Sequence, residues 1–419
     1  MNSVMQQIVG EMDRPMVSYL EACVHCGNCA SACHFYDATG DASYVPALKF
    51  APVLRTYQRE MAPLAGLKRA LGLAPAEVSE SELADWSKLL YDSCTMCGRC
   101  TLVCPMDIDI AYIVSVCRRA MTDHGYAPPE LKAASERSES QGSALGVTSD
   151  LLKERIDWIK DEHEVDVPLD KPRAEVLLTL SSIEVMKYPK DVAAMAQVMN
   201  HSGLDWTLSS SGYEATNFGY LAGDRQVSKI MVMRIVEAAE AVGAKTVIVP
   251  ECGHAYGVLR WNAANIIGRE LPFDVLHISE FLEQLRRDGK LKLKPMSKKV
   301  TFHDPCQITR RGGATQAPRN VLGAFATDFV EMTPSGNLNW CCGGGGGVAT
   351  ISAAKELQYK VFEIKREQVA QTGAEAMVSS CSNCRLIFDE DIEHAGWDKE
   401  NLSLVELVAE HLQDELPDQ

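Results

Sequence analysis

The sequence is short of positive charge. It has 41 Lys and Arg residues against 57 Asp and Glu, which gives a net charge of -16 over 419 residues. Proteins that bind the phosphate backbone of DNA or RNA do so through clustered basic side chains. We therefore expect no nucleic-acid partner for this chain.

Long apolar runs are also missing. The most apolar stretches, 108–116 and 245–259, are too short or too interrupted for the roughly 20 residues that a membrane-spanning helix needs. The first residues have neither the basic start nor the apolar centre of a secretory signal. We expect a cytoplasmic protein that reaches the cytoplasmic face of a membrane only through a partner.

Cysteine, in contrast, is abundant, with 15 residues in the chain. Disulfides are rare in a reducing compartment, where clustered cysteines indicate metal ligands or redox chemistry. Two runs, "CVHCGNCASACH" and "CTMCGRCTLVCP", share the spacing C-x2-C-x2-C-x3-C. This spacing is typical of proteins with two cubane [4Fe–4S] clusters, in which the fourth cysteine of each run ligates the other cluster.

The spacing therefore predicts two crossed ligand sets. One is Cys23, Cys26, Cys29 and Cys104, and the other is Cys94, Cys97, Cys100 and Cys33. Gly27 and Gly98 are expected to permit the tight turns within the loops. A pair of zinc sites is the alternative, although zinc favours two separate C-x2-C pairs. The segment between the runs has a helical pattern, which predicts a helical ferredoxin-like domain.

The rest of the chain divides into a polar segment and two similar modules. Each module has an apolar strand, a helix and another strand, and this alternation predicts parallel sheets covered by helices. The expected fold class is a multidomain α+β protein, with a helical dicluster ferredoxin domain followed by two pseudo-repeated α/β modules. The expected parts are 1–125 (ferredoxin-like), 126–172 (linker and packing helix), 173–295 (first module) and 296–419 (second module).

The two modules differ in their cysteines. Counting positions aligns Ser210, Ser211 and Val249 of the first module with Cys341, Cys342 and Cys381 of the second. The same count aligns Cys252 with Cys384. Serine and valine side chains are not iron ligands here, so the first module is expected to lack a cluster.

Five cysteines of the second module follow predicted strands, whose carboxyl ends meet at one edge of a parallel sheet. They are Cys306, Cys341, Cys342, Cys381 and Cys384. Two adjacent cysteines cannot easily serve one tetrahedral ion, but they can hold a larger iron–sulfide body. Gly343 and Gly344 would let the backbone approach it. A glycine-rich phosphate loop is the alternative, but the lysine and hydroxyl residue of that motif are missing.

The pattern "HDPC…CCG…CSNC" resembles the cysteine-rich CCG domain of heterodisulfide reductase catalytic subunits. The join of two ferredoxin clusters to two CCG modules resembles the HdrD type, and "PECGHAYG" in a degenerate first module resembles the DsrK branch. The resemblance implies that the five cysteines hold a non-cubane [4Fe–4S] cluster at which a disulfide or trisulfide substrate is reduced or formed. It implies electron relay through the cubane clusters. It also implies a b-type cytochrome membrane subunit or other redox subunits, and a small sulfur-carrier protein as substrate.

Three further residues are candidates for the chemistry. His303 could donate a proton to a leaving thiolate, or it could orient its loop by hydrogen bonds. Cys252 and His254 could act on the substrate, or they could be packing left from a lost cluster. Two other functions stay open: an electron relay in a hydrogenase complex, and a relay for a flavoprotein that oxidises 2-hydroxyacids or glycerol 3-phosphate.

Overall fold

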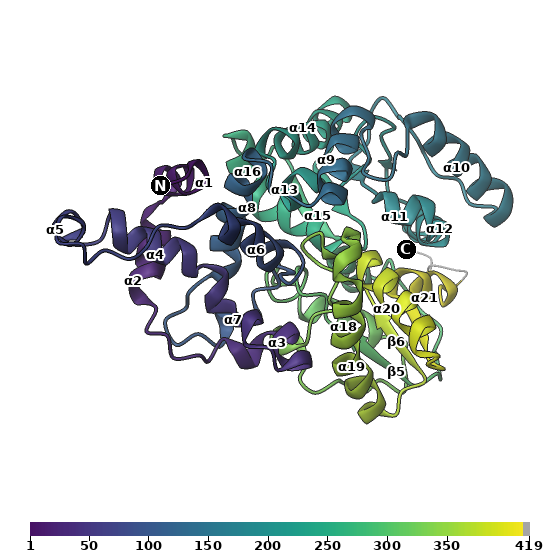
Figure 1. The fold of residues 1–419 in the computed structure, drawn as a ribbon. Coiled ribbons are helices and arrows are strands. Elements are labelled where there is room, and N and C mark those ends of the chain that lie inside the picture. The colour runs from purple at the N-terminus through teal and green to yellow at the C-terminus, as the bar shows by residue number, and fades with distance from the viewer. Residues whose placement is uncertain (414–419) are drawn as a thin grey trace. The chain divides into compact units, whose positions relative to one another are not determined.

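The computed structural model describes residues 1–413, and it divides the chain into two compact units (Figure 1). The first unit comprises Met1–Lys132, Leu221–Asp224 and Gly343–Ile364. The second comprises Ala133–Tyr220, Arg225–Cys342 and the residues from Lys365 onward. The first module, apart from Leu221–Asp224, and most of the second module lie in the second unit, while Gly343–Ile364 of the second module belongs to the first unit.

The first unit is helical, and its described residues contain no strand. A capping box between Ser79 and Glu82 starts one of its helices, and the Asp109 carboxylate caps another by accepting from Tyr112 N at 3.0 Å. This architecture confirms the predicted helical ferredoxin-like region. Its helices are α1 (Ser3–Glu11), α2 (Arg14–Ala22), α3 (His34–Thr39), α4 (Ala51–Glu60), α5 (Ala65–Ala70), α6 (Glu80–Tyr91), α7 (Arg99–Leu102) and α8 (Ile110–Asp123).

The second unit contains two sheets, and every strand pairing within them is parallel. Three of the strands, Val176–Leu178, Val300–His303 and Ala376–Ser379, are buried at every residue, as parallel strands covered on both faces are. The first sheet has the order β2-β1-β3-β4, and the second has the order β5-β6-β7. The strands are β1 (Val176–Leu178), β2 (Trp206–Thr207), β3 (Thr246–Val249), β4 (Asp274–His277), β5 (Val300–His303), β6 (Ala376–Ser379) and β7 (Glu400–Ser403).

The two sheets repeat one topology. In the first sheet, β2 pairs with β1. In the second sheet, the corresponding position beside β5 is taken by Phe329, which forms an isolated parallel bridge with Val300. The central strands β3 and β6 each lead into a helix, α15 (Gly253–Gly257) and α20 (Ser382–Ala395). The edge strands β4 and β7 also lead into a helix each, α17 (Ile278–Arg287) and α21 (Leu404–Glu410). This confirms the predicted pair of pseudo-repeated α/β modules.

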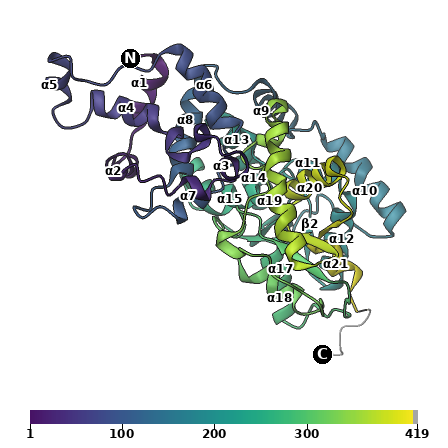
Figure 2. The same cartoon turned by 60° about the horizontal axis from the view of Figure 1, so that its bottom comes forward.

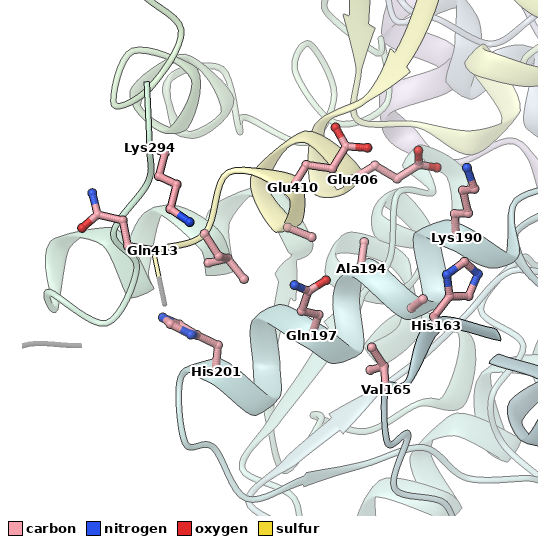
Figure 3. A pocket seen from close by; sticks show the side chains of 13 residues that line it. His163, Val165, Lys190, Ala194, Gln197, His201, Lys294, Glu406, Glu410 and Gln413 are labelled. Carbon is pink, nitrogen blue, oxygen red and sulfur yellow. The ribbon is translucent and has the colours of Figure 1, made fainter. Parts of the chain in front are cut away.

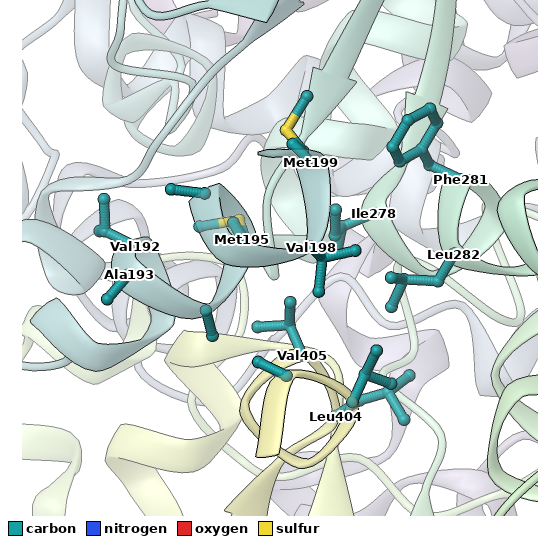
Figure 4. Packing of buried hydrophobic residues seen from close by; sticks show 14 of the residues in the cluster. Val192, Ala193, Met195, Val198, Met199, Ile278, Phe281, Leu282, Leu404 and Val405 are labelled. Carbon is teal, nitrogen blue, oxygen red and sulfur yellow. The ribbon is translucent and has the colours of Figure 1, made fainter. Parts of the chain in front are cut away.

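One hydrophobic core serves both modules. Helix α12 (Pro189–His201) of the first module packs against α21 of the second, and α17 packs against α18 (Gln316–Leu322) (Figure 2). In Figure 4, Val198 of α12 lies near Ile278 of α17 and points toward Val405 of α21. The other helices that include residues of this unit are α9 (Pro129–Gln141), α10 (Ser149–His163), α11 (Ser182–Met186), α13 (Phe218–Ala222), α14 (Arg225–Val242), a π-helical turn (Val258–Asn262), α16 (Ala263–Ile267) and α19 (Lys355–Thr372).

A buried ion pair joins the modules across this core. Arg385 of α20 donates from Nη1 to both carboxylate oxygens of Asp191 on α12, at 2.7 and 2.8 Å. The Asp191 side chain is fully buried. Removing one partner of such a pair leaves an uncompensated charge in the protein interior.

We predict that Arg385→Ala destabilises the second unit by about 3–5 kcal/mol, because the Asp191 carboxylate would lose its partner. The midpoint of urea unfolding measures the change. Arg286→Ala is the matched control, since Arg286 pairs with Glu283 at 2.6 Å but is 35% exposed. A surface pair of this kind contributes about 0–1 kcal/mol. Equal losses in the two variants would contradict the bridging role.

Candidate metal centres

Two cavities in the first unit are lined by the crossed cysteine sets that the spacing predicts. One is lined by Cys23, Cys26 and Cys29 from the first run together with Cys104 from the second. The other is lined by Cys94, Cys97 and Cys100 together with Cys33. Four thiols around one cavity, supplied as three plus one, form the donor set of a [4Fe–4S] cluster.

The two cysteine loops have the same backbone shape. Gly27 and Gly98 adopt left-handed conformations with φ of 79° and 74°, as the sequence predicts. His25 and Met96, at the matching place one residue before the second cysteine, also have positive φ, 54° in each loop. Non-glycine residues adopt this conformation rarely, and such strain concentrates at functional sites.

A buried lysine lies beside the second cavity. Lys49 Nζ donates to Ser93 O at 2.7 Å and to Leu89 O at 3.2 Å, and the residue is 2% exposed. Burial raises the pKa of the Cys33 thiol, and the Lys49 ammonium opposes that rise. A buried cation at this place offsets negative charge on the thiolates and on any cluster that they hold.

The glycine run after Cys342 packs closely within the first unit. Gly346 has φ of +65°, and a Cβ there would meet Cys94 O at 2.9 Å. The Arg118 guanidinium donates to Cys94 O at 2.8 Å and to Gly346 O at 2.5 Å. The missing side chains therefore allow this segment to lie against the loop that carries Cys94.

In the second unit, five cysteines from three loops converge at the carboxyl edge of the second sheet. Cys306 Sγ lies 3.9 Å from Cys341 Sγ, and Cys384 Sγ lies 3.2 Å from Cys342 Sγ. Cys381 contacts Cys384 through its side chain. All five residues are buried. The structure thus brings together the whole set that the sequence singles out, and the set fits a bulky iron–sulfur group.

His303, the last residue of β5, belongs to the same group. One of its ring nitrogens lies within 4.8 Å of the sulfurs of Cys342 and Cys384. Burial holds the pKa of His303 well below its usual range, and the cationic Lys365 and Arg310 lower it further. The imidazole is therefore neutral here, and its role as a proton donor stays a prediction.

Lys365 is a second buried lysine that the sequence analysis did not single out. It is 1% exposed and donates to Asn339 Oδ1 at 2.9 Å and to Gln368 Oε1 at 2.7 Å. Burial lowers its pKa to about 7, while Asp304 and the thiols of Cys341, Cys342 and Cys384 raise it. The sequence around Lys365 is a helix of mixed polarity and does not indicate that this residue is buried, because the burial arises only in the folded chain.

The helix caps correct one alignment of the two modules. Cys252 is the N-cap of α15, with φ and ψ of -133° and 102°, and Cys381 is the N-cap of α20, with -147° and 112°. Cys252 is therefore the counterpart of Cys381, and Ala255 is that of Cys384, contrary to the alignment by counting. The two alignments differ by three residues, and the turn after β3, which is one residue longer than the turn after β6, accounts for one of them.

Cys252 lies beside the five-cysteine group, since the Gly253 N–H donates to Cys381 Sγ and the Ser382 N–H donates to Glu251 O at 2.5 Å. His254 is half-buried in the first turn of α15. Gly343 and Gly344 belong to the first unit, and Gly343 has φ of +92°. Their predicted approach to a cluster stays a prediction.

One cavity in the second unit is lined by no cysteine. It has a volume of about 610 Å³ and lies between α12 and α21, where it is lined by His163, Lys190, His201, Lys294 and Glu410 among others (Figure 3). Its mixed charges and its lack of thiols separate it from the redox chemistry. In the part of the chain that the structure describes, no helix is long and apolar enough to cross a membrane.

Comparison with known proteins supports the same chemistry. Residues 19–108 match the 4Fe-4S dicluster domain, and residues 300–389 match the Cysteine-rich domain named CCG. The chain is therefore an iron–sulfur protein of the oxidoreductase class. It is homologous to the HdrD component of heterodisulfide reductases and to the iron–sulfur subunits of Hdr-like menaquinol oxidoreductases.

Three relatives illustrate the range of proteins to which the chain is similar. The D component of the dihydromethanophenazine:CoB–CoM heterodisulfide reductase of Methanosarcina barkeri is 28% identical over 400 residues, 94% of each chain. The Hdr-like menaquinol oxidoreductase iron–sulfur subunit of Archaeoglobus profundus is 25% identical over 81% of this chain and 69% of its own. The EtfAB:quinone oxidoreductase of Syntrophomonas wolfei is 27% identical over 90% of this chain and 56% of its own.

We predict that serine variants of the two runs fall into two crossed groups. Cys104→Ser should alter the same electron paramagnetic resonance signal as Cys26→Ser, because both thiols line one cavity. Cys33→Ser should alter the same signal as Cys97→Ser. Pairing of Cys104→Ser with Cys97→Ser instead would refute the crossed assignment.

We also predict that Lys49→Met makes the reduction potential of one cubane signal more negative, on the order of 60 mV for a tenfold change in its equilibrium. Removing the buried cation disfavours the added negative charge of the reduced state. A redox titration followed by paramagnetic resonance measures the shift.

Lys88→Met is the control for this titration, since its side chain is 69% exposed on α6 and its charge is screened by solvent. A shift of equal size in both variants would remove the special role of Lys49.

Proposed function

We propose that this chain is the sulfur-reducing or sulfur-oxidising subunit of a redox complex. Its substrate would carry a disulfide or trisulfide bond, and the reaction would take place at the five-cysteine group. The observation that carries the proposal is the convergence of five buried thiols, with sulfur–sulfur distances of 3.9 and 3.2 Å, beside His303.

The cofactor arrangement is part of the proposal. Two cubane [4Fe–4S] clusters would be held by the crossed sets in the first unit, and a non-cubane [4Fe–4S] cluster by Cys306, Cys341, Cys342, Cys381 and Cys384. Such a cluster, when bound, accepts single electrons and offers iron to a substrate sulfur. Cleaving one S–S bond takes two electrons and two protons. Carriers of single electrons must therefore transfer an electron twice in each turnover.

The protein's own residues shape this site in three ways. The buried position of the five thiols excludes water. Lys365 places a cation near Cys341, Cys342 and Cys384, which disperses negative charge. The Asn339 amide lies between Lys365 Nζ, at 2.9 Å, and His303 Nδ1, at 3.4 Å, and orients the imidazole.

The partners of this chain are proposals that we draw from the names of its relatives. The menaquinol oxidoreductase and quinone oxidoreductase names belong to those proteins. By analogy, we propose that electrons are exchanged with a b-type cytochrome membrane subunit or with other redox subunits. A small sulfur-carrier protein is the proposed substrate. The chain would then lie on the cytoplasmic face of a membrane through its partner.

A second candidate is an electron relay without sulfur chemistry. The similarity to an EtfAB:quinone oxidoreductase favours this candidate, because that name describes electron transfer to quinone. Copurification separates the two functions: a flavoprotein subunit supports the relay, and a b-haem subunit supports the sulfur enzyme.

We predict that Cys342→Ser abolishes disulfide or trisulfide reduction while the signals of both cubane clusters persist. The Cys342 thiol contacts Cys384 at 3.2 Å, whereas the cubane cysteines line other cavities. The assay uses anaerobically purified protein, a reduced dye as electron donor and thiol release as the readout. Cys117→Ser is the control, since Cys117 is buried within α8 and lines neither cysteine cavity of the first unit.

Two results would overturn the proposal. One is full thiol release by the Cys342→Ser variant. The other is a wild-type protein that transfers electrons from the dye to a quinone but releases no thiol from any S–S compound.

A further inference from the structure

The first module, which lacks a cluster of its own, buries a group of carboxylic acids near the five cysteines. Glu184, Glu214 and Glu251 are each at most 3% exposed. Burial raises the pKa of Glu184 to about 8, that of Glu214 to about 7 and that of Glu251 to about 7. Carboxyl groups of this kind are protonated near neutral pH and can donate a proton.

The three acids have different hydrogen-bond partners. Glu251 accepts from Ser403 Oγ at 2.9 Å and from Val405 N at 3.1 Å, which fastens it to the start of α21. Glu184 accepts from Ser181 in a capping box that begins α11. These contacts give both residues a role in holding local structure.

Glu214 instead belongs to a chain of contacts that ends on a thiol. Its Oε1 accepts from Thr216 N at 2.9 Å, and its side chain also contacts the Thr216 hydroxyl. Thr216 Oγ1 in turn lies 3.5 Å from Cys252 Sγ. Ser182 donates from its amide and from its hydroxyl to Oε2 of the same carboxyl.

The strand order explains why this chain of contacts reaches the redox site. The segment carrying Glu214 bridges to Leu180 at the carboxyl end of β1. Cys252 follows β3, the neighbour of β1, and the Gly253 N–H that follows it donates to Cys381 Sγ. The two modules therefore meet at Cys252 and Cys381. The first module contributes the Cys252 thiol, which the contacts of Thr216 connect to the Glu214 carboxyl, and the second contributes Cys381, a candidate iron ligand.

We infer that Glu214, Thr216 and Cys252 form a buried proton path that serves sulfur chemistry at the five-cysteine group, an inference that rests on the proposed function. Reduction of R–S–S–R′ takes two electrons from the iron–sulfur clusters and breaks the S–S bond to give two thiolates. The Cys252 thiol donates its proton to one of them, and the other takes its proton from solvent on release. Thr216 passes a proton from Glu214 to the Cys252 thiolate, and the Glu214 carboxylate later regains one from solvent. In thiol oxidation the proton moves the other way.

Other titratable groups surround this path and bear on its pH dependence. Glu184 on α11 interacts with both Glu214 and Glu251, and ionisation of each makes that of Glu184 less favourable. Tyr213, the residue before Glu214, has its pKa raised mainly by burial and also by the Glu214 charge. The Cys252 thiol has its pKa raised by burial and by the neighbouring Cys381.

The test compares Glu214→Gln, Thr216→Val and Glu184→Gln with the wild-type protein. Glutamine keeps the shape of the carboxyl but cannot release a proton, and valine removes only the bridging hydroxyl. We expect Glu214→Gln and Thr216→Val to lower the rate of thiol release by roughly 100-fold, the size of a lost acid–base contribution. We expect Glu184→Gln to keep the wild-type rate of thiol release at its pH optimum, because its carboxyl interacts with Glu214 through charge and has no contact with Thr216 among the described residues.

A second readout does not depend on turnover. Infrared spectra across pH should show protonated carboxyl bands that disappear near neutral pH. The component that is lost in Glu214→Gln should be shifted in Thr216→Val and should persist in Glu184→Gln, which loses a different component. Wild-type rates in Glu214→Gln, or a Glu214 carboxyl already ionised well below neutral pH, would overturn the path. A wild-type protein that releases no thiol would refute the proposed function itself, and the path would then have no thiolate to protonate.

Discussion

The parallel pairing of β5 with β6 is the constraint on which the proposed chemistry depends. The register sets His303 opposite Ser379, so both strands end together, and the loops that follow them carry Cys306 and Cys381 to one edge. Only the shared direction of the strands brings residues 75 positions apart into one group. Each module repeats this arrangement, and the shared core of α12, α17 and α21 holds the two edges in one unit.

The buried charges near the thiols follow one physical rule. Thiolates and iron–sulfur groups concentrate negative charge in a dry interior, where a buried cation or a helix start that offers N–H groups stabilises them. Lys49 is the buried cation beside the cavity lined by Cys33, and Lys365 is the buried cation near the five-cysteine group. Burying a lysine is unfavourable unless it is paired, so both positions argue for function.

The sequence predicted the parts that depend on local spacing. The crossed sets of Cys23 to Cys104, the left-handed Gly27 and Gly98, and the strand–helix repeat all follow from short-range patterns. Lys49, Lys365 and Glu214 could not be predicted, because each lies in an ordinary polar context and is buried only by distant segments. Counting matched Cys252 with Cys384, whereas the helix caps match it with Cys381, three residues away, because differences in loop length add up along the chain without changing the fold. The four-part division of the chain and the ligand roles of the cysteines stay predictions.

The most direct test of the central claim combines an iron count with a map of protected thiols. Protein purified without oxygen should contain about twelve iron atoms per chain if three four-iron clusters are present. Alkylation followed by peptide mass spectrometry should then find Cys306, Cys341, Cys342, Cys381 and Cys384 protected, and accessible only after the iron is removed in denaturant. About eight iron atoms, with those five thiols reacting under denaturing conditions before any iron is removed, would contradict the account.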